Sequence, residues 1–265
     1  MTIQTWISQY FDKANEYVFI TGASTGIGFE YLQSFASEGC RCVVLSNDES
    51  IHLVARETSA KFNVEVVPLQ IDLADLSQVT KLSQQLNSFK ITVVINNAGF
   101  GYKGDFLDMK TEMIVNMINV NSVAPTLISH DLVRKLRNYN KGFVVTVATI
   151  NIATPIAKNC IYTASKFYSY AFSMAMTKEN EDKDIYFQTL LPGTTDTPFH
   201  VKQGAKPSAL TMIPKDVSDY SLSHVDKVIC IPNRTDRYVF PFFSRIPILF
   251  RMKLASFILK KRLGV

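Results

Sequence analysis

The sequence lacks the features that mark a membrane span, a metal centre or a disulfide-stapled protein. No 18 consecutive residues are uncharged and apolar, so no transmembrane helix is expected. The four cysteines stand at positions 40, 42, 160 and 230 without a CxxC pair, and no histidine accompanies them at ligand spacing. We therefore expect no metal site, reduced thiols and a cytoplasmic protein.

Internal repeats, linkers and low-complexity tracts are absent as well. The composition is 47% hydrophobic and 19% charged, which is typical of a globular protein. The length of 265 residues suits one large α/β domain spanning the whole chain, 1–265.

Acidic residues are missing from one part of the chain. Seven of the 28 basic residues lie between 237 and 265, where no acid occurs, which leaves 21 bases against 23 acids in the remainder. A nucleic-acid-binding protein carries its positive charge across a folded face, so we expect no nucleic-acid partner. This basic, apolar tail has three candidate roles: packing over the substrate entrance, forming a subunit interface, or peripheral contact with an anionic membrane. Packing on the protein body is favoured, because Arg251 and Lys253 fall on opposite sides of a helix.

The N-terminus carries an apolar stripe at positions 3, 6, 7, 10 and 11. This spacing predicts an amphipathic helix over about residues 2–12. We expect it to lie on the body of the fold, with a membrane or partner contact as the alternative.

Apolar runs rich in valine and isoleucine alternate with helical patterns along the chain. Such runs are typical of strands that are covered on both faces, and the alternation predicts a mostly parallel, seven-stranded sheet with helices on both sides. The predicted strands are 17–21, 42–45, 64–69, 91–95, 143–147, 185–191 and 228–231, and a helix is predicted over 26–37. Ligands in this architecture bind beyond the carboxyl ends of the strands.

Glycines follow the first predicted strand in the string TGASTGIG. They permit a tight turn and let a pyrophosphate approach the N-terminus of a helix; the alternative is a turn without a ligand. The candidate cofactor-binding residues of this turn are Gly22, Ser24, Thr25, Gly26, Ile27 and Gly28.

Two later strands end in further candidate cofactor contacts. Asp72 and Leu73 follow the third strand, where the aspartate suits an adenine amino group or caps a helix. Asn97, Ala98 and Gly99 follow the fourth, where small residues let the backbone pass close to a ribose; an ordinary turn is the alternative.

The string YTASK places Tyr162 and Lys166 one helical turn apart, on the same face of a helix. An ammonium beside a phenol favours the phenolate and lowers the phenol's pKa from about 10 toward neutrality. Such a phenol can exchange a proton with a substrate oxygen, which predicts hydride transfer chemistry at a nicotinamide cofactor.

The strings TGASTGIG, NNAG, YTASK and PGTTDTPF, in this order and spacing, resemble the short-chain dehydrogenase/reductase family over roughly residues 15–235. The resemblance implies a single Rossmann-type, doubly wound domain and a nicotinamide cofactor. It also implies a catalytic tetrad of Asn121, Thr149, Tyr162 and Lys166. Tyr162 would be the general acid or base, and Lys166 would lower its pKa and hold the cofactor ribose.

Two tetrad positions need comment. Thr149 stands where the family has serine, and it keeps the hydroxyl while adding a methyl group that restricts its rotamer. Asn121 matches the asparagine whose backbone kinks a helix in the family, and its neighbour Asn119 is the alternative. The resemblance further implies that Pro192, Gly193, Thr194 and Thr197 close over the nicotinamide.

The end of the second strand bears on the choice of cofactor. Asn47 stands where NAD-linked relatives carry aspartate, Asp48 follows it, and Thr25 stands where NADP-linked relatives often carry a base. Acids at 48 and 49 would repel a 2′-phosphate. We therefore expect NAD, with NADP not excluded.

Apolar residues within 198–213, the segment that forms a lid in the family, predict a small apolar carbonyl or alcohol substrate. Phe100, Tyr102, Asn151 and Ile152 are candidate pocket walls. By analogy with the family, we expect a homodimer or homotetramer built on the helix of Tyr162 and the preceding long helix. The predicted function is an NAD(P)-dependent oxidoreductase that interconverts a secondary alcohol and a ketone; the alternative is a catalytically idle dinucleotide-binding scaffold or redox sensor.

Overall fold

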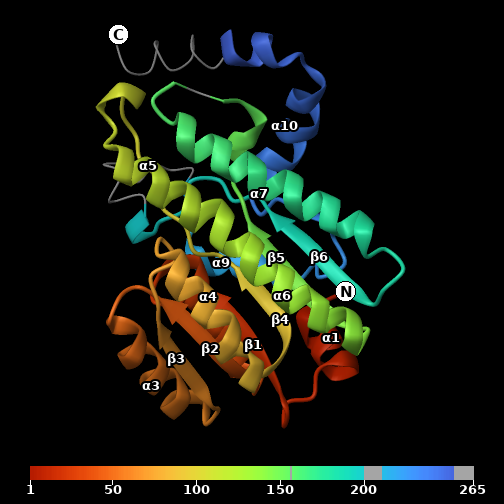
Figure 1. The fold of residues 1–265 in the computed structure, drawn as a ribbon. Coiled ribbons are helices and arrows are strands. Elements are labelled where there is room, and N and C mark those ends of the chain that lie inside the picture. The colour runs from red at the N-terminus through yellow and green to blue at the C-terminus, as the bar shows by residue number, and fades with distance from the viewer. Residues whose placement is uncertain (156, 200–210, 254–265) are drawn as a thin grey trace.

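The computed structural model describes residues 1–155, 157–199 and 211–253. Their centre is a seven-stranded sheet with the strand order β3-β2-β1-β4-β5-β6-β7, in which every pairing between neighbours is parallel (Figure 1). The strands are β1 (Glu16–Thr21), β2 (Arg41–Ser46), β3 (Val66–Gln70), β4 (Lys90–Asn96), β5 (Gly142–Val147), β6 (Ile185–Leu190) and β7 (Ile229–Cys230). The predicted fold class is therefore confirmed, and each predicted strand differs from the observed one by at most two residues at either end.

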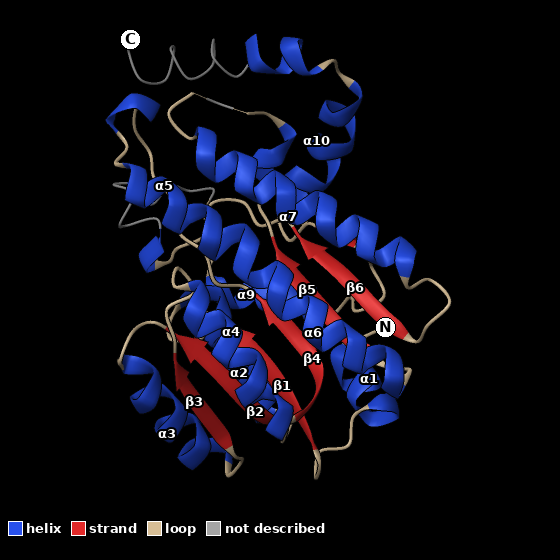
Figure 2. Cartoon of the chain, in the orientation of Figure 1, coloured by secondary structure: helices blue, strands red, loops and turns tan. Residues whose placement is uncertain are grey.

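Helices cover both faces of the sheet, as Figure 2 shows. They are α1 (Ile3–Tyr10), α2 (Gly26–Ser37), α3 (Ser50–Phe62), α4 (Leu76–Gln85), α5 (Thr111–Ile118), α6 (Ala124–Tyr139), α7 (Cys160–Glu179), α9 (Pro214–Leu222) and α10 (Arg234–Arg245). Short helical turns are η1 (Leu86–Ser88), η2 (Phe106–Asp108), η3 (Asn119–Val123) and η4 (Ile150–Ala153). One core cluster joins α1, α2, α3 and α9 to one face of the sheet, and a second joins α4 and α6 to the other. Because the strands are buried on both faces, they contain apolar residues in continuous runs rather than in alternation.

The sheet reverses its winding direction between β1 and β4. The chain runs outward from β1 through β2 to β3, and then returns to the other side of β1 with β4. The turns after β1 and β4 therefore diverge at the carboxyl ends of adjacent strands and leave a crevice between them. This topology fixes where a ligand site is to be sought.

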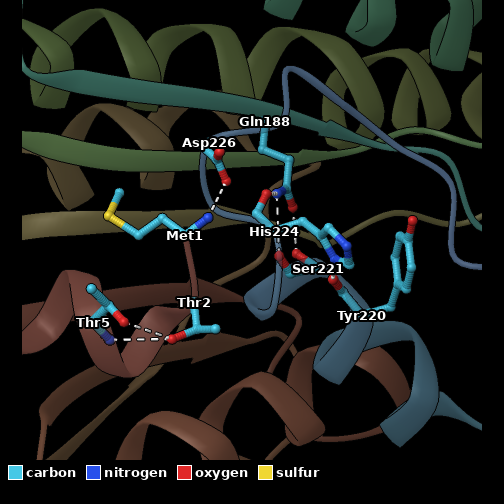
Figure 3. Close-up of polar contacts among 8 residues, drawn as sticks. All are labelled: Met1, Thr2, Thr5, Gln188, Tyr220, Ser221, His224 and Asp226. Atoms are coloured by element: carbon cyan, nitrogen blue, oxygen red, sulfur yellow. Dashed lines mark hydrogen bonds and ion pairs between the residues drawn. The ribbon is translucent and has the colours of Figure 1, made fainter.

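Helix α1 lies within the predicted range of 2–12 and buries Ile3, Trp6 and Ile7 in the core. The hydroxyl of Thr2 caps it by accepting a hydrogen bond from the backbone N–H of Thr5. The ammonium group of Met1 pairs with Asp226 at 2.6 Å, which fastens the N-terminus beside the loop before β7 (Figure 3). The first residues of the chain are thus tied to a segment more than 200 residues away.

A second tie in Figure 3 joins β6 to the end of α9. The side-chain amide of Gln188, which is fully buried, donates to the backbone carbonyls of Ser221 (3.2 Å) and His224 (2.7 Å). The hydroxyl of Ser221 donates in return to the amide oxygen of Gln188. A buried amide at mid-strand is thereby fully satisfied, which a buried polar group requires.

Glu16 places a carboxylate at the amino-terminal edge of the sheet, where it is fully buried. Lys90 (2.9 Å), which begins β4, and Lys141 (2.6 Å), which precedes β5, both pair with it. The hydroxyl of Thr92 and the backbone N–H of Asp12 donate to its other oxygen. Burial alone would raise the pKa of Glu16, but the hydrogen bonds from the two lysines outweigh burial, so this pKa lies below the ordinary 4.5.

Three of the four cysteines are buried thiols, and Cys160 is exposed. Burial raises the pKa of Cys40 and of Cys230 to about 12, and it raises that of Cys42 well above its ordinary value. No metal-ligand cluster of histidine, cysteine or acidic side chains occurs among the described residues. No helix within the described ranges is both long and apolar enough to cross a membrane.

Candidate functional site

A cavity of about 840 Å³ lies at the carboxyl ends of the strands, in the crevice between β1 and β4. It is lined by the turns that follow β1, β2, β3, β4, β5 and β6, by residues of α5 and η3, and by the first two turns of α7. The predicted residues on its wall are Gly22, Ser24, Thr25, Gly26, Ile27, Asn47, Asp72, Leu73, Asn97, Ala98, Gly99, Thr149, Tyr162, Lys166, Pro192, Gly193, Thr194 and Thr197. The other two predicted residues, Gly28 and Asn121, lie behind the wall.

The glycine turn after β1 needs glycine for three separate reasons. Gly22 (φ +65°) and Gly26 (φ +60°) have left-handed backbones that side chains disfavour. A Cβ on Gly26 would lie 2.9 Å from the Thr197 side chain. A Cβ on Gly28 would lie only 2.2 Å from the carbonyl oxygen of Gly22, so Gly28 lets α2 pack directly against the turn.

This turn presents the N-terminus of α2 to the cavity. Thr25 occupies the N-cap position of α2, and its hydroxyl makes no capping hydrogen bond. The first backbone N–H groups of the helix are therefore available to an anion, which the positive end of the helix dipole also favours. The turn fits the pyrophosphate of a dinucleotide.

Replacing Gly28 by alanine should weaken dinucleotide binding, because the new methyl group must displace the Gly22 carbonyl from the cradle. We expect a loss of about 5- to 200-fold in affinity, the equivalent of about 1–3 kcal/mol of overpacking. Fluorescence titration with NADH measures it.

Gly39→Ala is the matched control. Gly39 also has a left-handed backbone (φ +78°), but it ends α2 far from the cavity and has 3.8 Å of clearance. This change should cost about 1–2 kcal/mol of stability and leave NADH affinity unchanged. Equal losses of NADH affinity in both variants would contradict the role assigned to Gly28.

Asn97 connects β4 to the glycine turn through its side chain. Its amide nitrogen donates to the carbonyls of Thr21 (3.0 Å) and Gly22 (3.1 Å). The Thr21 hydroxyl accepts hydrogen bonds from the backbone N–H groups of Asn97 and Ala98, both at 3.0 Å. The Asn97 amide thus connects the turn after β4 to the turn after β1. Ala98 and Gly99 have small or no side chains, so their backbone lies directly on the cavity wall.

The far end of the cavity is formed by the turns after β2 and β3. The hydroxyls of Ser24 and Ser46 lie 3.0 Å apart, and the Ser46 hydroxyl accepts from the backbone N–H of Asp48 at 3.2 Å. Asp72 accepts a hydrogen bond from the backbone N–H of Ala74 at 2.9 Å, so it shapes its own turn as well as facing the cavity. Asn47 lies beside this group on the wall.

Tyr162 reaches the cavity from the first turn of α7, as its place in YTASK predicted. Thr149, at the end of β5, forms a hydrogen bond with the phenol, and the Phe199 ring lies 5.6 Å from the Tyr162 ring. Burial raises the pKa of Tyr162 to about 12, and the bond with Thr149 offsets only part of the increase. The prediction that Lys166 makes this phenol acidic is wrong for this arrangement, because desolvation of the phenolate dominates.

Lys166 lies one turn further along α7 and is also buried. Its ammonium group donates to the carbonyl of Val147 at 2.7 Å, at the end of β5. Burial lowers the pKa of Lys166 to about 8, since a desolvated ammonium is disfavoured. The lysine therefore remains largely protonated at neutral pH, within the wall that carries Tyr162.

Asn121 lies at the centre of η3, a single π-helical turn between α5 and α6. Its side chain pairs with both the N–H (3.0 Å) and the carbonyl (2.9 Å) of Phe100, and it donates to the Ser165 hydroxyl at 3.0 Å. The amide of Asn119 turns away and donates to the carbonyl of Ala74. Of the two candidates, Asn121 is the one that lies behind Lys166, since a Cβ on Gly99 would touch both side chains.

The segment after β6 forms the remaining wall. Thr195 and Met212 form an isolated parallel β-bridge. The backbone N–H of Asp196 donates to the carbonyl of Met212 at 2.8 Å, and the N–H of Met212 donates to the carbonyl of Thr194 at 2.9 Å. These contacts join the segment just before the predicted lid to Met212 near its end; residues 200–210 of the lid lie outside the described residues.

Several wall residues were not predicted. Asn116, Val120 and Asn159 line the cavity together with the predicted Phe100 and Asn151. The predicted wall residues Tyr102 and Ile152 do not, because Tyr102 lies over Gly104 and Ile152 is buried in a small core cluster. Asn159 is the N-cap residue of α7 and stands three residues before Tyr162, which is a spacing visible in the sequence.

Known proteins resemble this chain in sequence and in fold. A family model described as short chain dehydrogenase matches residues 16–208. The chain belongs to the short-chain dehydrogenase family. It is 25% identical over 235 residues to the very-long-chain 3-oxoacyl-CoA reductase of Mus musculus, covering 86% of this chain and 72% of that protein. It is 27% identical over 190 residues to the inactive hydroxysteroid dehydrogenase-like protein 1 of Homo sapiens, of which it spans 56%, while 70% of this chain is covered.

Solved short-chain dehydrogenases share the fold. One from Sphingobium yanoikuyae in complex with NADPH superposes with a TM-score of 0.79 at 26% identity, covering 88% of this chain and 96% of that one. The bulky-bulky ketone specific alcohol dehydrogenase of Comamonas testosteroni has a TM-score of 0.74 at 25% identity, with 88% and 95% covered. The chain therefore has the fold of solved dehydrogenases, one of which is bound to NADPH.

Proposed function

We propose that this short-chain dehydrogenase is an NAD(P)-dependent oxidoreductase that interconverts a secondary alcohol and a ketone. The observation that carries the proposal is the meeting of Tyr162, Thr149 and Lys166 on the wall of the same cavity as the glycine turn. The glycine turn fits a dinucleotide, whose nicotinamide supplies or takes the hydride when bound.

The chain's own residues handle the proton and the substrate oxygen in this proposal. With a pKa raised to about 12, Tyr162 carries its proton at neutral pH, which is the form that a general acid needs for carbonyl reduction. The Thr149 hydroxyl orients the phenol and polarises the carbonyl oxygen. Lys166 and Asn121 hold α7 against the ends of β5 and β4.

The substrate end of the cavity has both apolar and polar walls. Phe100, Phe199 and Val120 offer apolar surface, while Asn116, Asn151 and Asn159 present amides. The side-chain oxygen of Asn159 is buried and has no hydrogen-bond partner. An unpaired buried acceptor is costly, so we propose a substrate with an apolar body that also bears a hydrogen-bond donor, such as a hydroxyl group.

A panel of ketones tests the proposed activity. Pairs of aryl and alicyclic ketones, one of each pair bearing an added hydroxyl group, are supplied with NADH or NADPH, and cofactor oxidation is followed at 340 nm. Turnover with a lower KM for the hydroxylated member supports both the activity and the substrate class. Turnover without that difference contradicts only the substrate class.

The second candidate function is a dinucleotide-binding scaffold without turnover. It is favoured by the similarity to a relative whose name calls it inactive. Intact Tyr162 and Lys166 on the cavity wall speak for the enzyme. Dinucleotide binding without oxidation of the cofactor by any ketone of the panel would support the scaffold.

For the cofactor we propose NAD. Lys166 is the only basic side chain on the described part of the cavity wall, and it lies at the end with Tyr162, away from Asn47 and Asp48. A 2′-phosphate at the end with Asn47 would meet acids and amides but no base. The NADPH of the Sphingobium relative belongs to that protein.

We expect NADH to bind at least about 10-fold more tightly than NADPH. Asn47→Arg should improve NADPH affinity by about 10- to 100-fold, since a charge-assisted hydrogen bond contributes about 1.5–3 kcal/mol. Titration of both cofactors against both proteins measures this. A preference of the unchanged chain for NADPH would overturn the choice of NAD.

We also propose a homo-oligomer that uses α6 and α7. Leu127 on α6 and Phe167 and Tyr168 on α7 are exposed apolar side chains, at 40%, 48% and 45%. Apolar side chains exposed together on neighbouring helices are typical of a subunit interface.

A further inference from the structure

Helix α10 exposes apolar side chains to solvent on its outer face, while its inner face is half-buried against the body of the fold. Phe240 and Phe243 are half-buried on the inner side, where Phe240 packs against the core cluster of Ala148 and Ile231. On the outer side Tyr238 is 74% exposed and Phe242 is 64% exposed. Positions 238, 239 and 242 share one face of a helix, so Val239 joins them.

Further apolar side chains are exposed after Pro247. Ile248, Leu249 and Phe250 are exposed at 43%, 68% and 68%. Arg251 turns inward, and its guanidinium donates to the carbonyl of Ala153 in η4. That contact removes Arg251 from the exposed surface, so the two bases at 251 and 253 do not divide an outer polar face as the sequence suggested. We call Tyr238, Val239, Phe242, Ile248, Leu249 and Phe250 the outer C-terminal face.

The exposed charges of the same segment are mostly positive. Arg234, Arg245 and Lys253 are exposed, and no acidic residue occurs after Asp236. Asp236 itself is half-buried on the inner side of α10, beside Gly193. Exposed aromatic and aliphatic side chains among bases, with no acid between them, have the composition of helices that lie in a lipid headgroup layer.

We propose that the outer C-terminal face binds the surface of an anionic phospholipid bilayer. The apolar side chains would enter the boundary between headgroups and acyl chains while the bases contact the headgroups. A second copy of the chain fits this face less well, because a two-fold contact would bring bases of like sign together with no acid to pair them. This membrane contact does not depend on the proposed activity.

The outer C-terminal face lies on a helix that contacts an element of the cavity wall. Helix α10 contacts η4, and Asn151 of η4 lies on the cavity wall. In Figure 1, α10 lies at the end of the molecule toward which the strands point, which is the end that holds the cavity. Docking on a bilayer would therefore bring the substrate end of the cavity close to the lipid, where an apolar ketone or alcohol partitions.

Co-sedimentation of the full chain with vesicles tests the proposal. Phosphatidylcholine vesicles with about 30% phosphatidylserine supply the anionic surface, and pure phosphatidylcholine is the neutral comparison. We expect binding to the anionic vesicles that weakens by about fivefold for each base replaced, as in Arg245→Gln. Equal binding to neutral vesicles, or no binding to either, would overturn the proposal.

The double variant Phe242→Ser/Phe250→Ser examines the apolar part, with an expected loss of about 20- to 100-fold in vesicle binding. Leu107→Ser is the matched control, because Leu107 is 86% exposed on η2, outside the face. Circular dichroism and NADH titration of the same samples show that folding is intact. Vesicle binding that survives the double change would overturn the proposal, as would a chain that ignores vesicles but changes from dimer to monomer in the double variant.

Discussion

Replacing Tyr162 by phenylalanine should lower kcat for ketone reduction by about 10²- to 10⁴-fold while dinucleotide affinity changes by less than about threefold. The variant keeps the ring that packs against Phe199 and removes only the hydroxyl that meets Thr149. The rate therefore reports proton donation, and affinity reports the glycine turn, which the change does not touch. Steady-state kinetics on a ketone accepted in the panel, together with NADH titration, measure the two quantities.

Tyr170→Phe is the matched control for this experiment. It makes the same change on the same helix, away from the cavity wall, and should leave kcat within about twofold. If Tyr162→Phe retains the activity of the unchanged chain, Tyr162 is not the proton donor. If the unchanged chain also lacks turnover while it binds NADH, the scaffold function applies.

Replacing Glu16 by alanine should lower the free energy of unfolding by about 2–4 kcal/mol. The carboxylate is fully buried and joins the starts of β1, β4 and β5 through Lys90, Lys141 and Thr92. Its removal leaves a buried hydroxyl without its acceptor and two ammonium groups without their counter-ion. Because those lysines remain partly exposed, the loss stays below that of a fully enclosed pair. Urea unfolding measures it.

The stability that Glu16 contributes depends on pH in a definite direction. Its folded pKa lies below the ordinary 4.5, so the contribution is complete above about pH 4.5 and is lost as the pH falls through the folded value. The variant should therefore differ most from the unchanged chain at neutral pH and least in acid. Glu181→Ala, which removes an exposed ion pair with Lys178, should leave the free energy of unfolding nearly unchanged. A Glu16 variant that behaves like Glu181→Ala would show that the carboxylate is replaceable.

The parallel strands and the place of the cavity at their carboxyl ends follow from patterns in the sequence itself. Buried parallel strands require continuous apolar runs, and the glycine turn requires glycine at Gly22, Gly26 and Gly28 for steric reasons. The spacing of Tyr162 and Lys166 needs only a helix to bring both side chains to one wall. Predictions of this kind depend on backbone geometry, which local sequence largely determines.

Properties that depend on the packing of several elements could not be predicted from local sequence. The spacing of Tyr162 and Lys166 indicated a charge effect on the phenol, but the burial that raises its pKa comes from α7, β5 and the segment with Phe199 together. The bonds by which the Asn97 amide ties β4 to β1 also depend on the packing of two strands, and no local pattern indicates them. Asn116 reaches the wall from α5, whose packing no local pattern specifies.

The exposed thiol of Cys160 has a practical consequence. It begins α7, next to the wall residue Asn159, whereas the other three thiols are buried and have raised pKa values. Thiolate is the reactive form, so a maleimide dye should attach once per native chain, and the remaining sulfurs should become accessible only on denaturation. The molecule thus carries a single natural attachment point next to a residue of the cavity wall, where a fluorophore would report ligand entry without any engineered cysteine.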